Sequence, residues 1–191
     1  MKNKREYKCL NSQLFSHRDY SIITIQDSFI EPIRNWRNQQ INVLRQIVPI
    51  SVQDQKDYFE KHIWPDMHQN KPNNILLGFI EGKELVGYGG LVNIMWNHKR
   101  AELSFLMKTN LTQDEEVYSK YFINFLNLVT TMAFNEIGMH KIFTETFSMR
   151  SKHIKVLEDF GFKSEGFLRE HIFLDKRYID SQLHGLINYA G

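Results

Sequence analysis

The sequence lacks the features that mark several specialised protein classes. It has a single cysteine, Cys9, which rules out an internal disulfide, and no Cys/His spacing resembles a zinc site. Its formal net charge of +2 is too small to indicate nucleic acid or an anionic membrane as a partner. No window approaches 18 apolar residues, and no apolar stretch follows the charged start MKNKREYKCLNSQ. We therefore predict neither a membrane span nor a signal peptide, and we expect a cytoplasmic protein without a bound metal.

Repeats, low-complexity tracts and linkers rich in proline or glycine are also missing. What remains is an ordinary globular composition, with 42% hydrophobic and 24% charged residues. A chain of 191 residues is long enough to bury a core without disulfides. We expect one domain over residues 1–191, in which residues 1–19 could form an N-terminal extension.

The hydrophobic pattern of the first half predicts one strand, two helices and a three-stranded meander. YSIITIQ alternates and is β-branched, as expected of a strand. Two amphipathic helices should follow, the second beginning at Ser51 with a motif like a capping box. The meander should turn at Glu81-Gly82-Lys83. The predicted ranges are strand 20–26, helices 28–40 and 51–63, and strands within 73–95 and 100–110.

The second half predicts a long helix, a strand, a helix and a final hairpin. Apolar residues recur at spacings of three and four from about Glu116 to Ile137, and Gly138 should end that helix. KIFTETF is strand-like, and the helix after it is followed by two strands joined at Asp175-Lys176. The order β-α-α-β-β-β-α-β-α-β-β indicates a mixed α/β protein.

This order resembles the GNAT superfamily of acyl-CoA-dependent N-acetyltransferases over roughly residues 20–187. The likeness rests on GYGGLVNI, RAELSFLM, AFNEIGMHKIFTETF and VLEDFGFKSEGFLREH in sequence. It is greatest to the branch with ribosomal-protein N-terminal and bacterial amino-sugar acetyltransferases. The most specific part is the closing block, a helix with Glu-x-x-Gly-Phe, then Glu-Gly and Asp180. The resemblance implies a mostly antiparallel central sheet, helices on both faces and a splayed cofactor cleft.

The resemblance also implies acetyl-CoA as co-substrate. In such folds the strand corresponding to residues 102–108 separates from the strand corresponding to 141–147, and the pantetheine arm enters the gap like an added strand. The backbone groups that it pairs with would belong to Phe105, Leu106 and Met107.

The phosphate-binding loop of the family is not preserved. Relatives have a glycine-rich backbone cradle there, whereas this chain reads NLTQDEEVYSKYF, without glycine and with three adjacent acids. Acids also suit the first turn of any helix, so they need no ligand to explain them. The groups expected to bind phosphate are the remaining backbone amides, with the side chain of Lys120. Those amides belong to Tyr118, Ser119, Lys120 and Tyr121.

Glu102 is the candidate general base. Amide formation requires an amine freed of its proton, and a carboxylate within a largely apolar strand is costly without a partner or a task. By resemblance, an acid at this position lies close to the acceptor amine. The alternative is that Glu102 pairs with Arg100 or another cation at the end of the sheet.

Arg150 and His153 are candidates on the second strand-to-helix junction, where relatives carry Asn and Ser. By resemblance this helix start contacts the cofactor arm, and Arg150 could hold a phosphate or a carbonyl of the cofactor. The tyrosine that many relatives use near the sulfur is Leu157 here. His153 could instead protonate the thiolate, since its unperturbed pKa lies near 6.5. Both could equally be solvated surface residues.

The acceptor side should come from the first helix and the meander. Polar and aromatic residues there suit a sugar or a nucleotide, although Trp36 also fits the core and Asp180 could simply end a hairpin. The candidates are Trp36, Arg37, Asn38, Asn93, Trp96 and Asp180.

These residues favour an acetyl-CoA-dependent N-acetyltransferase that transfers directly to a primary amine in a ternary complex. We expect the acceptor to be a small molecule, an amino sugar or a sugar nucleotide in the first instance. A protein N-terminal acetyltransferase is the second hypothesis, and a catalytically silent GNAT fold is the third. A homodimer is a further expectation.

Overall fold

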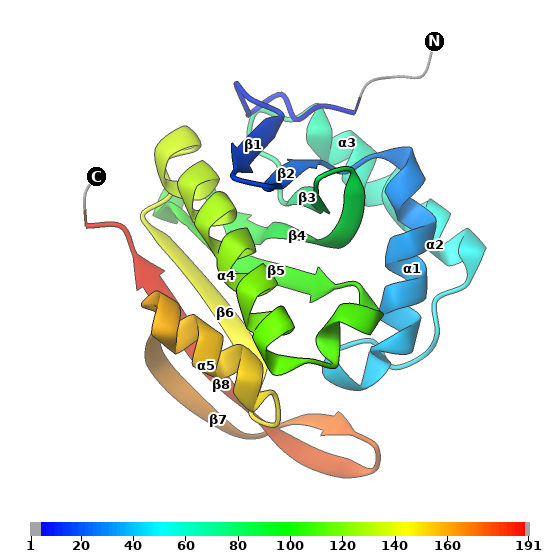
Figure 1. Ribbon diagram of the computed structural model, residues 1–191, viewed down its shortest axis with the longest axis vertical. Helices are drawn as coiled ribbons and strands as arrows, with labels where there is room; N and C mark the ends of the chain where they lie inside the picture. The colour runs from blue at the N-terminus through cyan, green and yellow to red at the C-terminus, as the bar shows by residue number, and fades with distance from the viewer. Residues whose placement is uncertain (1–4, 190–191) are drawn as a thin grey trace.

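The computed structural model describes residues 5–189, which form one eight-stranded sheet (Figure 1). The spatial order is β1-β2-β3-β4-β5-β6-β8-β7, and only the β5–β6 pair is parallel. This confirms the predicted α/β fold with a mostly antiparallel sheet. The strands are β1 Leu14–His17, β2 Tyr20–Thr24, β3 Ile75–Glu81, β4 Glu84–Met95, β5 Arg100–Met107, β6 Lys141–Phe147, β7 Lys163–Leu174 and β8 Arg177–Ile187.

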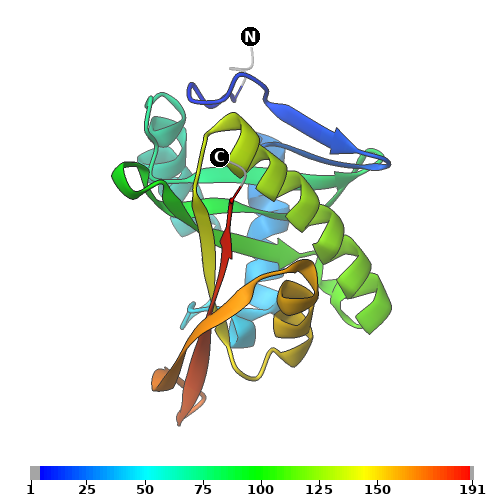
Figure 2. The same cartoon turned by 90° about the vertical axis from the view of Figure 1, so that its left-hand side faces the viewer.

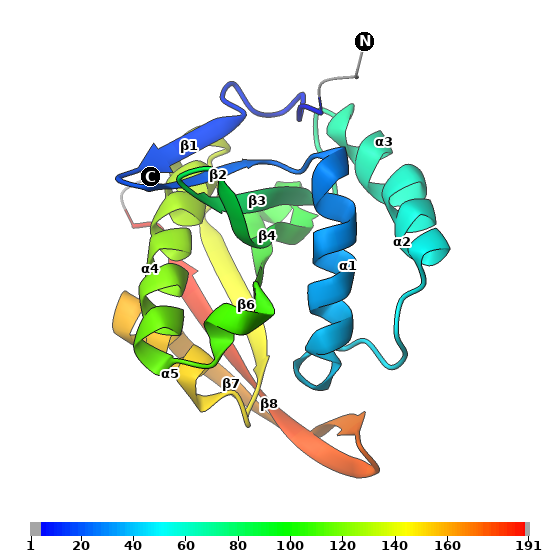
Figure 3. The ribbon, with the colours of Figure 1, turned by 45° about the vertical axis from the view of Figure 1, so that its right-hand side comes forward.

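Helices cover both faces of the sheet. Helices α4 and α5 lie side by side on one face, and α1 lies on the other, with α2 and α3 beside it (Figures 2 and 3). The hairpin of β7 and β8 extends beyond the rest of the molecule and turns at Asp175 and Lys176, both with positive φ, as the sequence predicts. The helices are α1 Ile30–Gln39, α2 Val52–Tyr58, α3 Trp64–Met67, α4 Glu115–Thr131 and α5 Ser151–Phe160.

An aromatic cluster fastens α4 to the sheet. The ring of Phe105 on β5 stacks on Phe122 at 4.7 Å and lies 4.5 Å from Phe125, both on α4. Phe79 on β3 meets Phe125 edge to face at 5.5 Å. Each of these rings is buried, and such pairs add about 0.5–1.5 kcal/mol beyond the area that they bury. The cluster sets the position of α4 above the middle of the sheet.

The sequence prediction missed the first strand and treated residues that belong to the fold as an N-terminal extension. LFSH is too short and too exposed to show an alternating pattern, yet it pairs with β2 as β1. Tyr7 is also part of the core, and its hydroxyl accepts a hydrogen bond from the Leu76 amide at 2.8 Å. Much of the expected N-terminal extension therefore packs against the sheet; residues 1–4 lie outside the described residues.

The sheet opens between β5 and β6. The two strands are paired only at Arg100–Lys141, Ala101–Ile142 and Glu102–Phe143. Beyond Glu102, β5 stays paired with β4 and β6 stays paired with β8, so one edge of each strand is left open. This confirms the predicted splay.

Gly89 on β4 lies against this part of β5 and admits no side chain. A Cβ there would lie 2.1 Å from the Ser104 carbonyl oxygen and 2.8 Å from the Phe125 ring. We expect Gly89→Ala to lower the free energy of unfolding by about 1–3 kcal/mol, because neither the backbone nor the packed ring can yield freely. Urea unfolding measures the change. Gly166→Ala is the control, since its Cβ would meet Leu183 at an ordinary 3.6 Å. Equal stabilities of the two variants would contradict this packing.

Candidate active site

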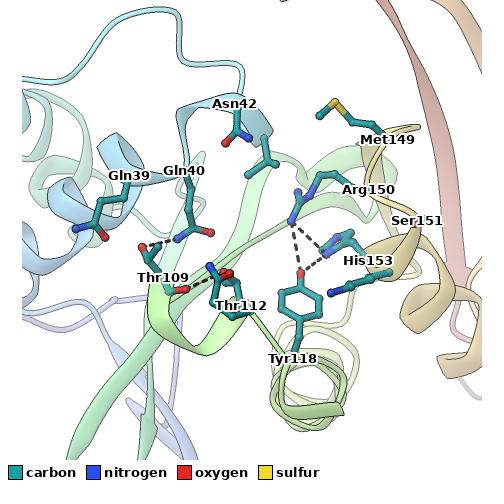
Figure 4. A pocket seen from close by; sticks show the side chains of 13 residues that line it. Gln39, Gln40, Asn42, Thr109, Thr112, Tyr118, Met149, Arg150, Ser151 and His153 are labelled. Carbon is teal, nitrogen blue, oxygen red and sulfur yellow. Dashed lines mark hydrogen bonds between the residues drawn. The ribbon is translucent and has the colours of Figure 1, made fainter. Parts of the chain in front are cut away.

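Two cavities meet at the opening of the sheet. The first, of about 210 Å³, lies between the separating strands and is lined by Glu102–Phe105 of β5 and Thr144–Phe147 of β6. The second, of about 430 Å³, lies between the starts of α4 and α5 and the end of α1 (Figure 4). Arg150 and His153 line both cavities, so the two form one cleft. We call it the central cleft.

The open edge of β5 directs peptide groups toward the central cleft. The Met107 carbonyl accepts a hydrogen bond from the Gln40 side chain at 2.9 Å, on the side away from β4. Residues two apart in a strand face the same way, so Phe105 shares this orientation, whereas Leu106 faces β4. Of the three residues predicted to pair with pantetheine, Phe105 and Met107 have the suitable orientation.

The start of α4 differs from the expected phosphate site. Asp114 caps the helix, and its Oδ1 accepts from the amides of Glu116 at 2.8 Å and Val117 at 2.9 Å. The Tyr118 amide donates to the Asp114 carbonyl, and the amides after it donate within the helix. The prediction that the amides of residues 118–121 bind phosphate is therefore wrong, because these amides lie beyond the first turn.

Lys120 and Tyr121 lie on the far side of α4 from the central cleft. Lys120 Nζ is 5.8 Å from the Tyr20 ring, and the Tyr121 hydroxyl donates to Glu81 at 2.5 Å. Ser119 does not line either cavity. On the cleft side it is the Tyr118 side chain that reaches in, through its hydroxyl rather than its amide.

Tyr118, His153 and Arg150 form a hydrogen-bonded group at the junction of the cavities (Figure 4). The Tyr118 hydroxyl lies 2.7 Å from His153 Nδ1, and an Arg150 Nη2 donor lies 3.4 Å from that hydroxyl. The His153 ring stacks on Phe122 at 4.3 Å. Burial raises the pKa of Tyr118, and the neighbouring Arg150 guanidinium opposes that rise.

His153 is held in its neutral form. Burial of the ring lowers its pKa well below the ordinary value, and the positive charge of Arg150 lowers it further. To protonate the thiolate, as the sequence suggested, His153 would have to be an imidazolium ion. A neutral imidazole whose Nδ1 already faces a phenol has no such proton to give. The structure thus brings His153 to the cleft, as expected, but favours a packing and positioning role.

Glu102 lies at the last position where β5 pairs with β6, and it belongs to a charged cluster. Its Oε2 accepts from Asn93 at 2.8 Å, and its Oε1 lies 3.3 Å from Arg45 Nη1. Arg45 Nη2 also contacts Glu145 Oε2 at 2.8 Å, so one guanidinium bridges carboxylates on neighbouring strands. The alternative of a cation partner for Glu102 is therefore realised, through Arg45 rather than Arg100. We call Glu102 and Glu145 the carboxylate pair.

A third cavity, of about 380 Å³, adjoins the carboxylate pair. It lies between the sheet and helices α1 and α2, and it shares Arg37, Val92 and Ser104 with the first cavity. Arg37 is held there by the Tyr88 hydroxyl at 2.9 Å and by Gln46 at 3.1 Å. Tyr58 lines its other side.

Four of the predicted acceptor residues do not line these cavities. Trp36 is in the core, as one of the two interpretations holds. Asn38 binds Ile50 and Gln46 and so shapes the segment after α1. The Trp96 indole donates to the Pro72 carbonyl at 2.7 Å. Asp180 accepts from the Glu170 amide at 2.7 Å, on the β7–β8 hairpin. Arg37 and Asn93 do line the cavities.

Sequence reasoning missed Glu145 and Arg45. The signal for Glu145 was present, because it is a carboxylate in a strand whose residues after Lys141 are otherwise apolar or β-branched, which is the argument that identified Glu102. Arg45 lies in a segment without regular structure, between the 3₁₀ turn Ile41–Val43 and α2. No periodicity could indicate where its side chain points.

Comparisons with known proteins agree with this fold. Residues 21–183 match the sequence profile of the acetyltransferase (GNAT) domain family. Over 130 residues, 68% of this chain and 69% of the relative, the chain is 25% identical to the spermidine N(1)-acetyltransferase of Vibrio cholerae. The chain also resembles the crystal structure of spermidine N-acetyltransferase from Vibrio cholerae in complex with CoA and spermine. That match has a TM-score of 0.76 at 20% identity and covers 90% of this chain and 96% of the other.

Two further structures show the same architecture. A dodecameric structure of the Vibrio cholerae enzyme has a TM-score of 0.74 at 21% identity, over 90% of this chain and 95% of that one. A probable acetyltransferase has a TM-score of 0.71 at 18% identity, and the match covers 92% of this chain and 97% of the other. The fold, with the family match over residues 21–183, defines an acetyltransferase. The chain belongs to the GNAT acetyltransferase family, whose members use acetyl-CoA, which confirms the predicted enzyme class.

The central cleft fits acetyl-CoA in one part and departs from the family in another. The open edge of β5 and the joined cavities suit a pantetheine arm. The start of α4 offers no free cradle, because Asp114 occupies the amides of Glu116 and Val117. Cations line the opposite wall, namely Arg150 and Lys152, the latter paired with Glu115 at 3.1 Å.

Within residues 5–189, no group of three or more His, Cys, Asp or Glu side chains is arranged to hold a metal ion. Over the same residues no helix is both long enough and apolar enough to cross a membrane.

The lowered pKa of His153 predicts a loss of stability in mild acid. Below the ordinary histidine pKa near 6.5, the unfolded chain binds a proton at this residue and the native chain does not. The free energy of unfolding should therefore fall between pH 7 and pH 5, by at most about 1.4 kcal/mol per pH unit from this residue. Urea unfolding at several pH values should show a shallower loss for His153→Gln. His140→Gln, on the surface, should keep the wild-type slope; equal slopes for both variants would contradict the neutral His153.

Proposed function

We propose that the protein transfers the acetyl group of acetyl-CoA directly to a primary amine held in the first cavity, beside Glu102. The observation that carries the proposal is the position of Glu102. Its carboxylate stands where β5 and β6 separate, faces the cavity, and is oriented by Asn93 at 2.8 Å. A base at this point meets the amine at the end of the channel that suits the pantetheine arm.

The transfer forms a C–N bond to the acetyl carbon and breaks the C–S bond of the thioester. An acceptor that arrives as an ammonium ion loses two protons, one of which ends on the thiol sulfur while the other passes to solvent. Before the C–N bond forms, Glu102 accepts one proton from the ammonium group, which frees the lone pair of the amine. Asn93 keeps the carboxylate aimed into the cavity while it does so.

The phosphates of the cofactor would be met by cations at the start of α5, namely its N-cap residue Arg150 and Lys152, rather than by amides of α4. Arg150 lies where the two cavities join, and Lys152 lines the second one. Lys152 would exchange its ion pair with Glu115 for a phosphate oxygen, since that pair is largely exposed and weak. Polar uncharged groups at Gln40, Thr109 and Thr112 line the facing side of this cavity (Figure 4).

The acceptor that the geometry supports best is a cationic amine such as a polyamine. Two carboxylates border the first cavity, and a protonated amine complements them in charge. The Vibrio cholerae relatives are spermidine acetyltransferases, and one of them was crystallised with spermine. A flexible chain could extend from the carboxylate pair into the adjoining third cavity.

An amino sugar, the acceptor expected from the sequence, is the second candidate. The third cavity is lined by Tyr58, Tyr88 and Arg37, which can stack on or bond to a sugar ring. Trp36 and Trp96, on which that expectation first depended, do not line it.

Glu102→Gln tests the role of the carboxylate. We expect turnover to fall by roughly 10²-fold or more, because the amide keeps the shape of the side chain but accepts no proton. Release of free thiol from acetyl-CoA measures the rate. Glu60→Gln, on the surface away from the cleft, is the matched control and should keep the wild-type rate. Near-full activity of Glu102→Gln would remove Glu102 from the mechanism.

The same assay run with a panel of acceptors separates the candidate functions. Spermidine, glucosamine, an amino-sugar nucleotide and a short peptide with a free N-terminus represent the classes. Fast release with spermidine alone supports the polyamine proposal, and release with the peptide alone would support a protein N-terminal acetyltransferase. No release with any of them, and no thermal stabilisation by CoA, would leave a catalytically silent fold.

A further inference from the structure

Arg45 occupies the place that the proposed acceptor needs. Its guanidinium lies between the two carboxylates, with Nη1 3.3 Å from Glu102 Oε1 and Nη2 2.8 Å from Glu145 Oε2. All three residues line the first cavity. The cleft therefore already contains one cation, donated by the chain itself, at the point where a protonated amine would bind.

The two sides of this contact are built differently. The side chains of Glu102 and Glu145 are only 13% and 15% exposed, and both belong to paired strands. The side chain of Arg45 is 49% exposed and comes from an irregular segment. The carboxylates are thus permanent walls of the cavity, while Arg45 enters from solvent. A half-exposed ion pair is weak, so Arg45 can leave at small cost.

Glu145 has capacity for a further donor. Its Oε1 is buried and makes no hydrogen bond within the described residues; the cation-forming group next to it is His171 Nε2, at 3.9 Å. A buried carboxylate oxygen without a donor is costly. An ammonium group carries three donors, so it can satisfy Glu145 Oε1 together with the oxygens that Arg45 now contacts.

The backbone near Arg45 need not move. After Arg45, Asn38 at the end of α1 bonds to Gln46 at 2.8 Å and to both backbone groups of Ile50. Before Arg45, the Leu44 amide donates to the Ile41 carbonyl at 3.2 Å. Withdrawal of Arg45 then requires only rotation of its own long side chain toward solvent.

We propose that Arg45 is a built-in competitor of the acceptor: the carboxylate pair binds the ammonium group of an aliphatic amine, and that group displaces the Arg45 guanidinium. The inference rests on the proposed acetyltransferase function and specifies its acceptor as a cation. Arg45 stops the two carboxylates from repelling one another when the cavity holds no amine, and it raises the concentration of amine at which the enzyme becomes active.

Arg45→Gln tests the competition with spermidine as the probe. Removal of the guanidinium should lower the KM for spermidine by about two- to fivefold, the range of a half-exposed ion pair, and should change kcat less than KM. Arg45→Lys keeps a positive charge and should keep a KM close to wild type. Lys61→Gln is the control, because Lys61, in the helical segment Phe59–Ile63, is a more exposed cation, 67% against 49% for Arg45, and lines none of the three cavities. A KM that rises or stays unchanged in Arg45→Gln would overturn the proposal.

Glu145→Gln tests the other half of the contact. It removes one carboxylate without removing the proposed base, so the KM for spermidine should rise by about tenfold while kcat falls less. In Arg45→Gln/Glu145→Gln the benefit of losing Arg45 should shrink, since the cation and the amine share this partner. An unchanged KM in Glu145→Gln would show that the amine binds elsewhere.

Equilibrium binding separates the failure of this inference from the failure of the proposed function. Isothermal titration of spermidine into each variant, without acetyl-CoA, reports the competition even if no acceptor is acetylated. Tighter binding by Arg45→Gln than by wild type supports the displacement whatever the turnover. Turnover of spermidine with equal or weaker binding by Arg45→Gln would leave the acetyltransferase standing and remove the role of Arg45.

Discussion

The early separation of β5 from β6 is the constraint on which the rest of the molecule depends. After the Glu102–Phe143 pair the two strands no longer share hydrogen bonds, and each is held only by its other neighbour. Backbone groups of β5 consequently face open space, where an added strand-like ligand can pair with them. The first cavity of the central cleft lies at this point, and the second joins it at Arg150 and His153. The aromatic cluster fixes α4 to the sheet beside them.

The charges of the cleft are distributed in a way that suits two different ligands. At the inner end, two strand carboxylates meet a cation that comes from an exposed segment. At the outer end, Lys152 of α5 pairs with Glu115 at the start of α4. At the inner end a cationic acceptor can replace the guanidinium beside the carboxylates, and at the outer end an anionic cofactor can replace Glu115 beside Lys152, because each ligand takes the place of an existing ion-pair partner.

Fold prediction succeeded where periodicity and turns carry the information. The meander, the long amphipathic helix and the Asp175-Lys176 hairpin each follow from local pattern, whereas LFSH was missed because it is short and exposed. In the cleft, Glu102 could be predicted because a carboxylate in a largely apolar strand is costly unless it has a partner or a function. The amides of residues 118–121 were wrongly chosen because α4 already begins at Glu115, so these amides donate within the helix.

The sequence by itself determined the family, the order of elements and the strand that carries the base, since these depend on local spacing and on motifs in order. Only the tertiary structure decided which charges meet. Arg45 and Glu102 are 57 residues apart along the chain, and Glu102 and Glu145 are 43 residues apart. Nothing in their local sequence indicates that their side chains meet. The same holds for His153, whose burial against Phe122 and beside Arg150 sets its protonation. Electrostatics depends on distance and on water exclusion, and both are properties of the packed chain.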